Sequence, residues 1–193
     1  VKTYDQIISI SKLNHPSVLR FKGYSLYDFK KRPRPVIITE YALNGTLENL
    51  IRKERKSKFM PQFDETRKLI IIYGIASAMS YLHAHNIIHR DLKPANILID
   101  NFMFPKIADF GLSKINHSNV ESMTKCSMGL IKGTPIYMSP SDVYAFAFIV
   151  YEVITNQKPF DGCNIFEIPL KIKKGYRPSF NDSVADSYVN LIT

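Results

Sequence analysis

The order of apolar and turn-forming residues predicts an α+β fold, with a small β-rich part first and a mainly helical part after it. Two segments near the start, 18–24 and 36–41, are rich in β-branched and aromatic residues, and a basic, proline-containing stretch separates them. Farther along, two long apolar segments have the length of helices, with short apolar runs between them. A chain of 193 residues is long enough to bury a core of its own.

The first part of the chain predicts two strands and two helices. Apolar residues recur at helical spacing over 7–13, and Pro16 follows that helix because proline removes a backbone donor. The two β-rich segments come next and predict a pair of strands. An Asn-Gly turn at 44–45 then precedes Thr46, which can cap a helix that runs through Lys56.

The remaining sequence predicts two longer helices and a small sheet. Asp64 can cap a helix that ends near His85, and 142–155 is apolar on nearly every side, as in a helix buried in a helical core. Residues 113–127 have loop composition. Short apolar runs predict a small sheet laid on the first of these helices, at 87–88, 97–99 and 106–108. The apolar face expected on that helix consists of Leu69, Ile72, Tyr73, Ala76 and Met79.

Composition excludes several classes of protein. With 45% hydrophobic and 22% charged residues, the chain is neither a disordered tail, nor collagen-like, nor a coiled coil. Its apolar stretches fall short of the roughly 20 residues that span a membrane, and it opens without a signal-peptide pattern, so we expect a cytoplasmic protein with no transmembrane segment. Cys126 and Cys163 have no CxxC spacing, which predicts neither a disulfide framework nor a zinc site.

A formal net charge of +9 predicts attraction to phosphate-bearing partners. Solvated loops and helix ends are the simpler interpretation of this excess, and binding of nucleic acid or lipid is the alternative. The charge is concentrated in two runs, one formed by Lys30, Lys31, Arg32 and Arg34, the other by Arg52, Lys53, Arg55, Lys56 and Lys58.

The most specific segment is the octapeptide His-Arg-Asp-Leu-Lys-Pro-Ala-Asn at 89–96, followed thirteen positions after Asn96 by Asp-Phe-Gly at 109–111. An aspartate such as Asp91 can orient a substrate hydroxyl and accept its proton, and Lys93 can offset charge that develops on a transferred phosphoryl group. Magnesium prefers oxygen ligands, so Asn96 and Asp109 form a candidate metal site.

These motifs resemble the signature of the eukaryotic protein kinases, which combines the catalytic loop H-R-D-L-x-x-x-N with the metal-binding D-F-G. The Leu-Lys-Pro-Ala of this loop and the segment 133–138 look like serine/threonine kinases, and 21–24 and 40–47 are similar to the tyrosine-kinase-like group. The resemblance implies a protein-kinase-like fold, with a partial small β lobe and a mainly helical large lobe. It also implies ATP and Mg²⁺ as cofactors, and Asp91, Lys93, Asn96 and Asp109 as catalytic residues.

The resemblance places further residues one at a time. It makes Thr39 the gatekeeper, the backbone of Glu40 and Ala42 the adenine-binding hinge, and Leu98 the floor under the adenine. It makes Asp142 the aspartate that anchors the catalytic loop to a buried helix. The regulatory hydrophobic spine of the family corresponds to Ile10, Phe21, His89 and Phe110.

Resemblance also implies two domains, a partial small lobe over 1–42 (regulatory helix, fourth and fifth strands, hinge) and a large lobe over 43–193. Three parts of the family pattern are missing. The eight glycines contain no G-x-G-x-x-G, no strand with the phosphate-pairing lysine precedes the first helix, and Gln6 stands where its glutamate partner is expected. A segment is also missing between Pro140 and Ser141, and we expect the large lobe to be truncated after Thr193.

Two functions from different classes fit these residues. The first is a protein serine/threonine kinase that transfers the γ-phosphoryl group of ATP to Ser or Thr of protein substrates in signalling. The alternative is a catalytically silent pseudokinase, or a fragment, that acts as a binding or scaffold module. Nucleic-acid binding rests on the net charge alone, so we expect no nucleic-acid partner.

From the missing groups we predict that these 193 residues by themselves transfer little phosphate. Catalysis of phosphoryl transfer depends on positioning and charge stabilisation, and a single preorganised donor contributes about 3 to 4 kcal/mol to the transition state in other enzymes. Magnesium-dependent transfer from ATP to a generic basic protein measures this, with a version extended through any upstream coding sequence as the control. Comparable turnover by the two proteins would contradict the prediction.

Overall fold

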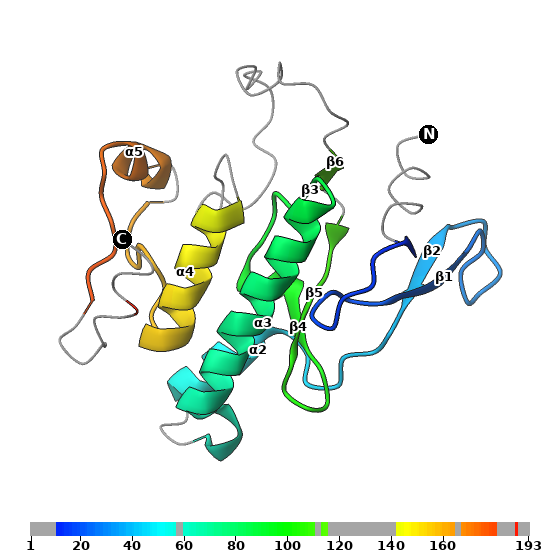
Figure 1. The fold of residues 1–193 in the computed structure, drawn as a ribbon, viewed down its shortest axis with the longest axis horizontal. Helices are drawn as coiled ribbons and strands as arrows, with labels where there is room; N and C mark the ends of the chain where they lie inside the picture. Colours follow the sequence, from blue (N-terminus) through cyan, green and yellow to red (C-terminus); the bar gives the residue numbers. More distant parts are fainter. Residues whose placement is uncertain are drawn as a thin grey trace.

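A long central helix, α3 (Glu65–Ala84), organises the computed structural model (Figure 1). The structure describes residues 11–56, 60–110, 113–115, 142–164, 167–180 and 188. Helix α4 (Asp142–Thr155) packs along one side of α3, and the ladder of β4 (Ile97–Ile99) and β5 (Pro105–Ile107) lies on its other side (Figure 1). The arrangement of small antiparallel sheets and several helices agrees with the predicted α+β, kinase-like class.

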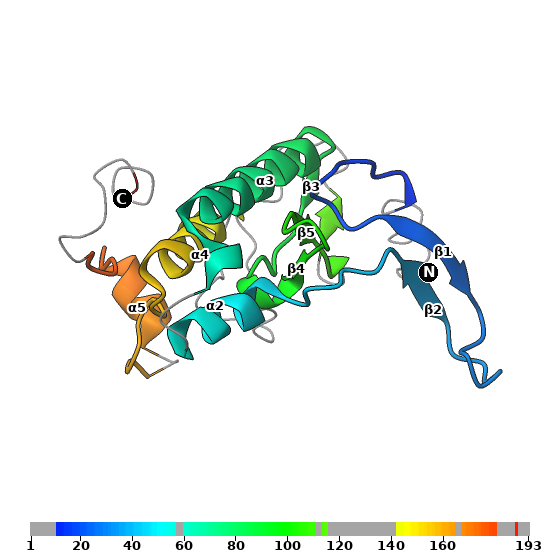
Figure 2. The same ribbon diagram turned by 90° about the horizontal axis from the view of Figure 1, so that it is seen from below.

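The strands form separate two-stranded ladders, all antiparallel. Strands β1 (Phe21–Ser25) and β2 (Val36–Thr39) make a hairpin that projects from one end of the molecule, opposite α5 (Ile168–Lys173) (Figure 2). Strand β3 (Ile87–Ile88) pairs with β6 (Lys114–Ile115). The sheet expected beside the long helix is therefore two separate ladders. Strand β6 lies in a segment whose composition predicts a loop. Composition misses it because a strand of two residues depends on its pairing partner more than on its own side chains.

Local capping signals locate the helices correctly. The Oγ1 atom of Thr46 accepts a hydrogen bond from the backbone N–H of Asn49 (3.2 Å), which satisfies a free donor at the start of α2 (Leu47–Lys56). Asp64 caps α3 in the same way, by accepting from the N–H of Arg67 (2.8 Å). Asn86, which follows the end of α3, has a positive φ of 58° and turns the chain into β3.

The face of α3 predicted to be buried is correct only in part, since Ile72 and Met79 are buried but other members are not. Leu69 and Tyr73 belong to the expected face but are 49% and 76% exposed. Between Leu69 and Met79 apolar residues occupy almost every side of the helix, so spacing alone cannot select a face. The neighbouring β5 and α4 select it instead. The residues of α3 that are buried are Lys68, Ile71, Ile72, Gly74, Ile75, Ala78, Met79 and Leu82.

A lysine on this buried face is paired with two carboxylates. The Nζ atom of Lys68 lies 2.9 Å from Oε1 of Glu54 on α2 and 3.0 Å from Oε1 of Glu65. Burial by itself lowers the pKa of Lys68, but the hydrogen bonds to Glu54 and Glu65 outweigh it and raise that pKa above its ordinary value. Because the Lys68 side chain is 7% exposed and charged, removing Glu54 would leave a buried cation with less compensation.

Two short helical turns, η1 (Pro61–Phe63) and η2 (Pro94–Asn96), complete the described elements. The predicted helix over 142–155 is confirmed as α4, with Phe148, Ile149, Val150 and Val153 almost fully buried. Several sequence interpretations concern residues outside the described part of the chain. These are Gln6, Ile10, the segment 133–138 and the junction at Pro140.

We predict that Gly74→Ala destabilises the protein, although alanine favours helices by about 1 kcal/mol over glycine. A Cβ atom on Gly74 would lie 2.6 Å from Cγ of Pro105 and 2.9 Å from Oγ of Ser17, so β5 and the segment before β1 would have to move away from α3. Such overpacking costs about 1–3 kcal/mol. Urea denaturation should therefore give a lower midpoint for Gly74→Ala. Gly23→Ala is the control, since nothing lies within 4 Å of its added Cβ, and an equal midpoint for wild type and Gly74→Ala would contradict the argument.

Candidate active site

A buried carboxylate on α4 anchors the loop that carries the octapeptide. Asp142 is 3% exposed, and its Oδ2 accepts from the backbone N–H of His89 (2.8 Å) while its Oδ1 accepts from that of Arg90 (2.9 Å). Nε2 of His83, near the end of α3, lies 3.0 Å from Oδ2 of Asp142. Since a buried charge requires several hydrogen bonds, this carboxylate ties together three segments that are distant in sequence.

The His89 side chain links the same loop to β5. Its Nε2 lies 2.8 Å from the carbonyl oxygen of Ala108, which can only accept, so Nε2 carries the proton. Its Nδ1 accepts from the backbone N–H of Asp91 at 3.4 Å. Burial lowers the pKa of His89, which keeps the ring neutral at pH 7 and suits this pair of contacts. The ring also packs against Phe110, with centroids 5.1 Å apart.

Three of the predicted catalytic residues form one cluster. Nζ of Lys93 lies 2.9 Å from Oδ2 of Asp91. Nδ2 of Asn96 donates to the same Oδ2 (3.0 Å) and to the Asp91 backbone oxygen (2.8 Å). Asp91 is 7% exposed, so its carboxylate is held by a cation and an amide in a largely dry position.

The fourth predicted residue, Asp109, is connected to this cluster through the backbone. The N–H of Ala108 donates to the carbonyl of Asn96 (2.9 Å), which brings Asp109 next to the segment that carries Asn96. Asp109 has a positive φ of 59°, and Arg90 in the octapeptide loop has one of 68°. Non-glycine residues adopt this conformation only where their surroundings impose it, and such positions are common at functional sites.

The oxygen ligands of Asn96 and Asp109 fit the chemistry that Mg²⁺ prefers. Because Nδ2 of Asn96 is used in contacts with Asp91, the amide oxygen is directed away from that residue. Within the described residues, no group of three or more His, Cys, Asp or Glu side chains is arranged to hold a metal ion. A magnesium ion at Asn96 and Asp109 would thus need additional ligands from phosphate oxygens or water, as is usual for this metal.

The residues expected around the adenine lie on β2, β4 and the segment between β2 and α2. Thr39 is exposed at the end of β2, and Ala42 is 8% exposed. Leu98 on β4 forms a bridge with Thr46, which brings the start of α2 beside this strand. The ion pair between Glu40 and Lys106, which is the β5 partner of Leu98, joins the same segment to the β4–β5 ladder a second time.

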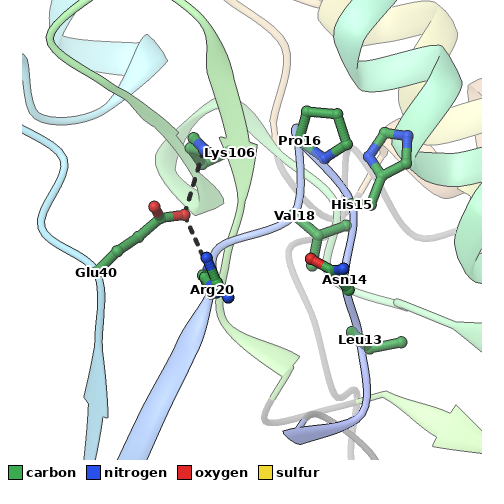
Figure 3. Close-up of a pocket in the computed structure, with 8 residues that line it drawn as sticks. All are labelled: Leu13, Asn14, His15, Pro16, Val18, Arg20, Glu40 and Lys106. Atoms are coloured by element: carbon green, nitrogen blue, oxygen red, sulfur yellow. Dashed lines mark hydrogen bonds and ion pairs between the residues drawn. The ribbon is translucent and has the colours of Figure 1, made fainter.

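The side chain of Glu40 is directed into a separate pocket (Figure 3). Its Oε1 accepts from the backbone N–H of Arg20 (2.9 Å) and lies 3.3 Å from Nζ of Lys106. The open pocket has a volume of about 260 Å³. Its described lining contains Glu40 but none of the octapeptide, and consists of Leu13, Asn14, His15, Pro16, Val18, Arg20, Glu40 and Lys106. This pocket is therefore distinct from the cluster around Asp91.

Sequence reasoning missed the partners that hold these residues in place. His83 and Asp142 are separated by 59 positions, and Lys106 lies on β5 whereas Glu40 follows β2. A single histidine near a helix end and a lysine on a short strand carry no local signal of such contacts. His83 could have been suspected only because helix C-termini favour residues that can be positively charged.

Comparison with known proteins agrees with this geometry. A family model described as "Protein tyrosine and serine/threonine kinase" matches residues 2–193. The chain is 34% identical to a putative serine/threonine-protein kinase/receptor of Acanthamoeba polyphaga mimivirus, over 97% of the chain and 11% of that protein. It is 35% identical to the serine/threonine-protein kinase CTR1 of Arabidopsis thaliana, over 82% of the chain and 20% of that protein.

A third relative is a probable LIM domain-containing serine/threonine-protein kinase of Dictyostelium discoideum, 31% identical over 100% of the chain and 30% of that protein. The chain therefore spans between about a tenth and a third of the length of these relatives. Among the described helices, none has the length and apolar character needed to cross a bilayer.

We predict that Asp142→Asn lowers the free energy of unfolding by about 1–3 kcal/mol, because an amide nitrogen would face an N–H group that now has a carboxylate acceptor. Urea denaturation measures the change. Asp161→Asn serves as the control, since Asp161 is exposed. If both variants unfold at the midpoint of the wild type, the Asp142 carboxylate does not stabilise the loop.

Proposed function

The chain belongs to the protein kinase family, and from that membership we propose that it transfers the γ-phosphoryl group of ATP to serine or threonine hydroxyls of protein substrates. The relatives that share 31–35% identity with it are named serine/threonine-protein kinases, which favours these acceptors over tyrosine. We also propose that residues 1–42 form part of the small lobe, and residues 43–193 the large lobe. Participation in signalling and a cytoplasmic location belong to the same proposal.

One observation carries most of this proposal: the Asp91 carboxylate is held between Nζ of Lys93 and Nδ2 of Asn96, at 2.9 and 3.0 Å. A carboxylate fixed in this way can receive the proton of an incoming hydroxyl without rearranging first. The neighbouring Lys93 is close enough to interact with a phosphoryl group that approaches the same hydroxyl. Its positive charge would stabilise the negative charge that spreads over the phosphoryl oxygens in the transition state.

Asn96 and Asp109 are the residues we propose for binding Mg²⁺. A bound magnesium ion supplies charge neutralisation and orients the phosphate oxygens of ATP. The contribution of this chain is to place one amide oxygen and one carboxylate on adjoining segments, linked by the hydrogen bond from Ala108 to Asn96. The positive φ of Asp109 belongs to the same local geometry.

Adenine binding is assigned to Thr39, Glu40, Ala42 and Leu98. The Glu40 side chain is held by Arg20 and Lys106, and its backbone N–H donates to the carbonyl of Arg20 (2.9 Å). Its carbonyl oxygen, which can accept a second hydrogen bond, and the backbone of Ala42 are therefore the parts proposed to contact the base. Leu98 is half-buried on β4 and supplies an apolar surface. Thr39 stands at the end of β2, where its Oγ1 donates to the backbone oxygen of Glu40 (3.1 Å).

The proposal predicts that Asp91→Asn lowers kcat on the order of 10²–10⁴-fold, since an amide cannot accept the hydroxyl proton. The assay should use a version of the protein extended through any coding sequence upstream of Val1, with Mg²⁺, ATP and a generic basic protein. Phosphoamino-acid analysis of the product should show phosphoserine or phosphothreonine.

Asp161→Asn is the matched control, since it removes an exposed carboxylate and should retain full turnover. Measuring nucleotide binding on the same proteins distinguishes a slower transfer step from a weaker affinity for ATP. Unchanged turnover of Asp91→Asn would refute its role as proton acceptor. Predominant phosphotyrosine would refute the proposed acceptor specificity, and ATP binding without transfer in the wild type would indicate the silent module.

A further inference from the structure

The connection between β1 and β2, residues 26–34, combines exposed apolar side chains with a run of cations; we call it the hairpin tip. Figure 2 shows that it projects from the end of the molecule opposite α5. The proposed catalytic chemistry uses none of these residues. The composition of the hairpin tip instead suggests that it binds a separate partner.

Three large apolar side chains of the hairpin tip are open to solvent. Phe29 is 96% exposed, Leu26 61% and Tyr27 57%. Isolated exposed apolar residues are ordinary on protein surfaces, but three within four consecutive positions form a local apolar protrusion. Because Phe29 is almost entirely exposed, folding gives it no stabilisation from apolar burial. Only contact with another molecule would remove its ring from water.

Cations surround this protrusion. Lys30, Lys31, Arg32 and Arg34 are all exposed, and Asp28 is the one carboxylate of the tip, which leaves a net charge of +3. The second basic run of the sequence lacks this combination. Helix α2 carries Arg52, Lys53, Arg55 and Lys56 but no exposed large apolar side chain within its bounds.

Asp28 holds the hairpin tip in a defined shape. Its Oδ1 accepts from the backbone N–H groups of Lys30 (2.9 Å) and Arg32 (3.0 Å), and its Oδ2 accepts from Nε of Arg32 (2.7 Å). The backbone N–H of Lys31 donates to the carbonyl of Asp28 (2.8 Å). The hydrogen bond from the Arg32 side chain also lowers the pKa of Asp28. The turn is thus ordered by its own contacts, and Phe29 is presented without any need for a further ordering step.

We propose that the hairpin tip docks on the surface of an anionic lipid bilayer. Phe29, with Leu26 and Tyr27 beside it, enters the interfacial region, and Lys30, Lys31 and Arg34 lie at the level of the headgroups. Aromatic side chains favour this region, and each basic residue near an anionic surface contributes about a factor of five to binding. Such a contact would hold the catalytic loop at a membrane while leaving the residues around Asp91 unoccupied.

The shape of the tip favours a bilayer over the other anionic partners. A convex protrusion fits a fluid surface directly, whereas an acidic protein would need a complementary hollow. Single-stranded nucleic acid can stack on Phe29 and Tyr27, but it has no use for the aliphatic side chain of Leu26. A lipid interface uses all three apolar side chains and the cations at once.

Sedimentation with vesicles tests the proposal. The probe is phosphatidylcholine vesicles with roughly one-third phosphatidylserine, compared with phosphatidylcholine alone. We expect the wild-type chain to bind the anionic vesicles and to be released by salt. Lys30→Glu with Lys31→Glu should weaken binding at least tenfold, and Phe29→Ser about tenfold, because the ring would no longer leave water.

Matched controls separate the tip from general charge and apolarity. Lys53→Glu with Lys56→Glu removes the same charge from α2, and Phe102→Ser removes a ring that is 66% exposed on another turn. Both controls should bind within about twofold of wild type, and urea midpoints should be unchanged for all four variants because the altered side chains are exposed.

The proposal would be overturned by equal binding to neutral and anionic vesicles, by no binding at all, or by equal losses in tip and control variants. It would also be overturned if a single-stranded RNA bound through the tip at a salt concentration that abolishes vesicle binding. A role for the tip that is purely electrostatic would appear as a loss in the Lys30/Lys31 variant alone, which contradicts the insertion of Phe29.

Discussion

The arrangement of this protein depends on one buried carboxylate. Asp142 is 3% exposed, and it receives backbone N–H groups from His89 and Arg90 as well as the ring of His83. An unpaired charge in that position would be strongly unfavourable, so the carboxylate fixes the distance between α4, the end of α3 and the loop between β3 and β4. The loop is held by its backbone, and its side chains remain available for chemistry.

This constraint explains the conformation of the candidate active site. With His89 and Arg90 fixed, the neutral imidazole of His89 joins the loop to Ala108, and Ala108 in turn donates to Asn96. The positive φ angles of Arg90 and Asp109 are maintained by these contacts. The cluster of Asp91, Lys93 and Asn96 is thus preorganised by neutral and buried groups around it, which is what an enzyme that works by positioning requires.

Charge is used differently in the two ends of the molecule. Lys68 on α3 and Lys106 on β5 are paired in largely buried positions, with Glu54 and Glu40 respectively. At the hairpin tip the cations remain exposed, and Asp28 serves to order the turn through Arg32. The excess of basic residues is therefore not spread evenly: the paired cations stabilise the fold, and the exposed ones are available to a partner.

Local signals in the sequence determined the start of α2 and α3, the burial of α4, the order of the elements from β1 to β5, and the residues of the octapeptide. Caps, turns and motifs act over a few positions and can therefore be read locally. Only the tertiary structure decided which face of α3 is buried, that β3 pairs with β6, and that Glu40 contacts Lys106. Leu69 and Tyr73 belong to the face that spacing predicts to be buried but are exposed, because apolar residues surround the helix from 69 to 79 and the neighbouring elements select the face. Contacts such as that between His83 and Asp142 join residues 59 positions apart, and no local pattern specifies a partner at that distance.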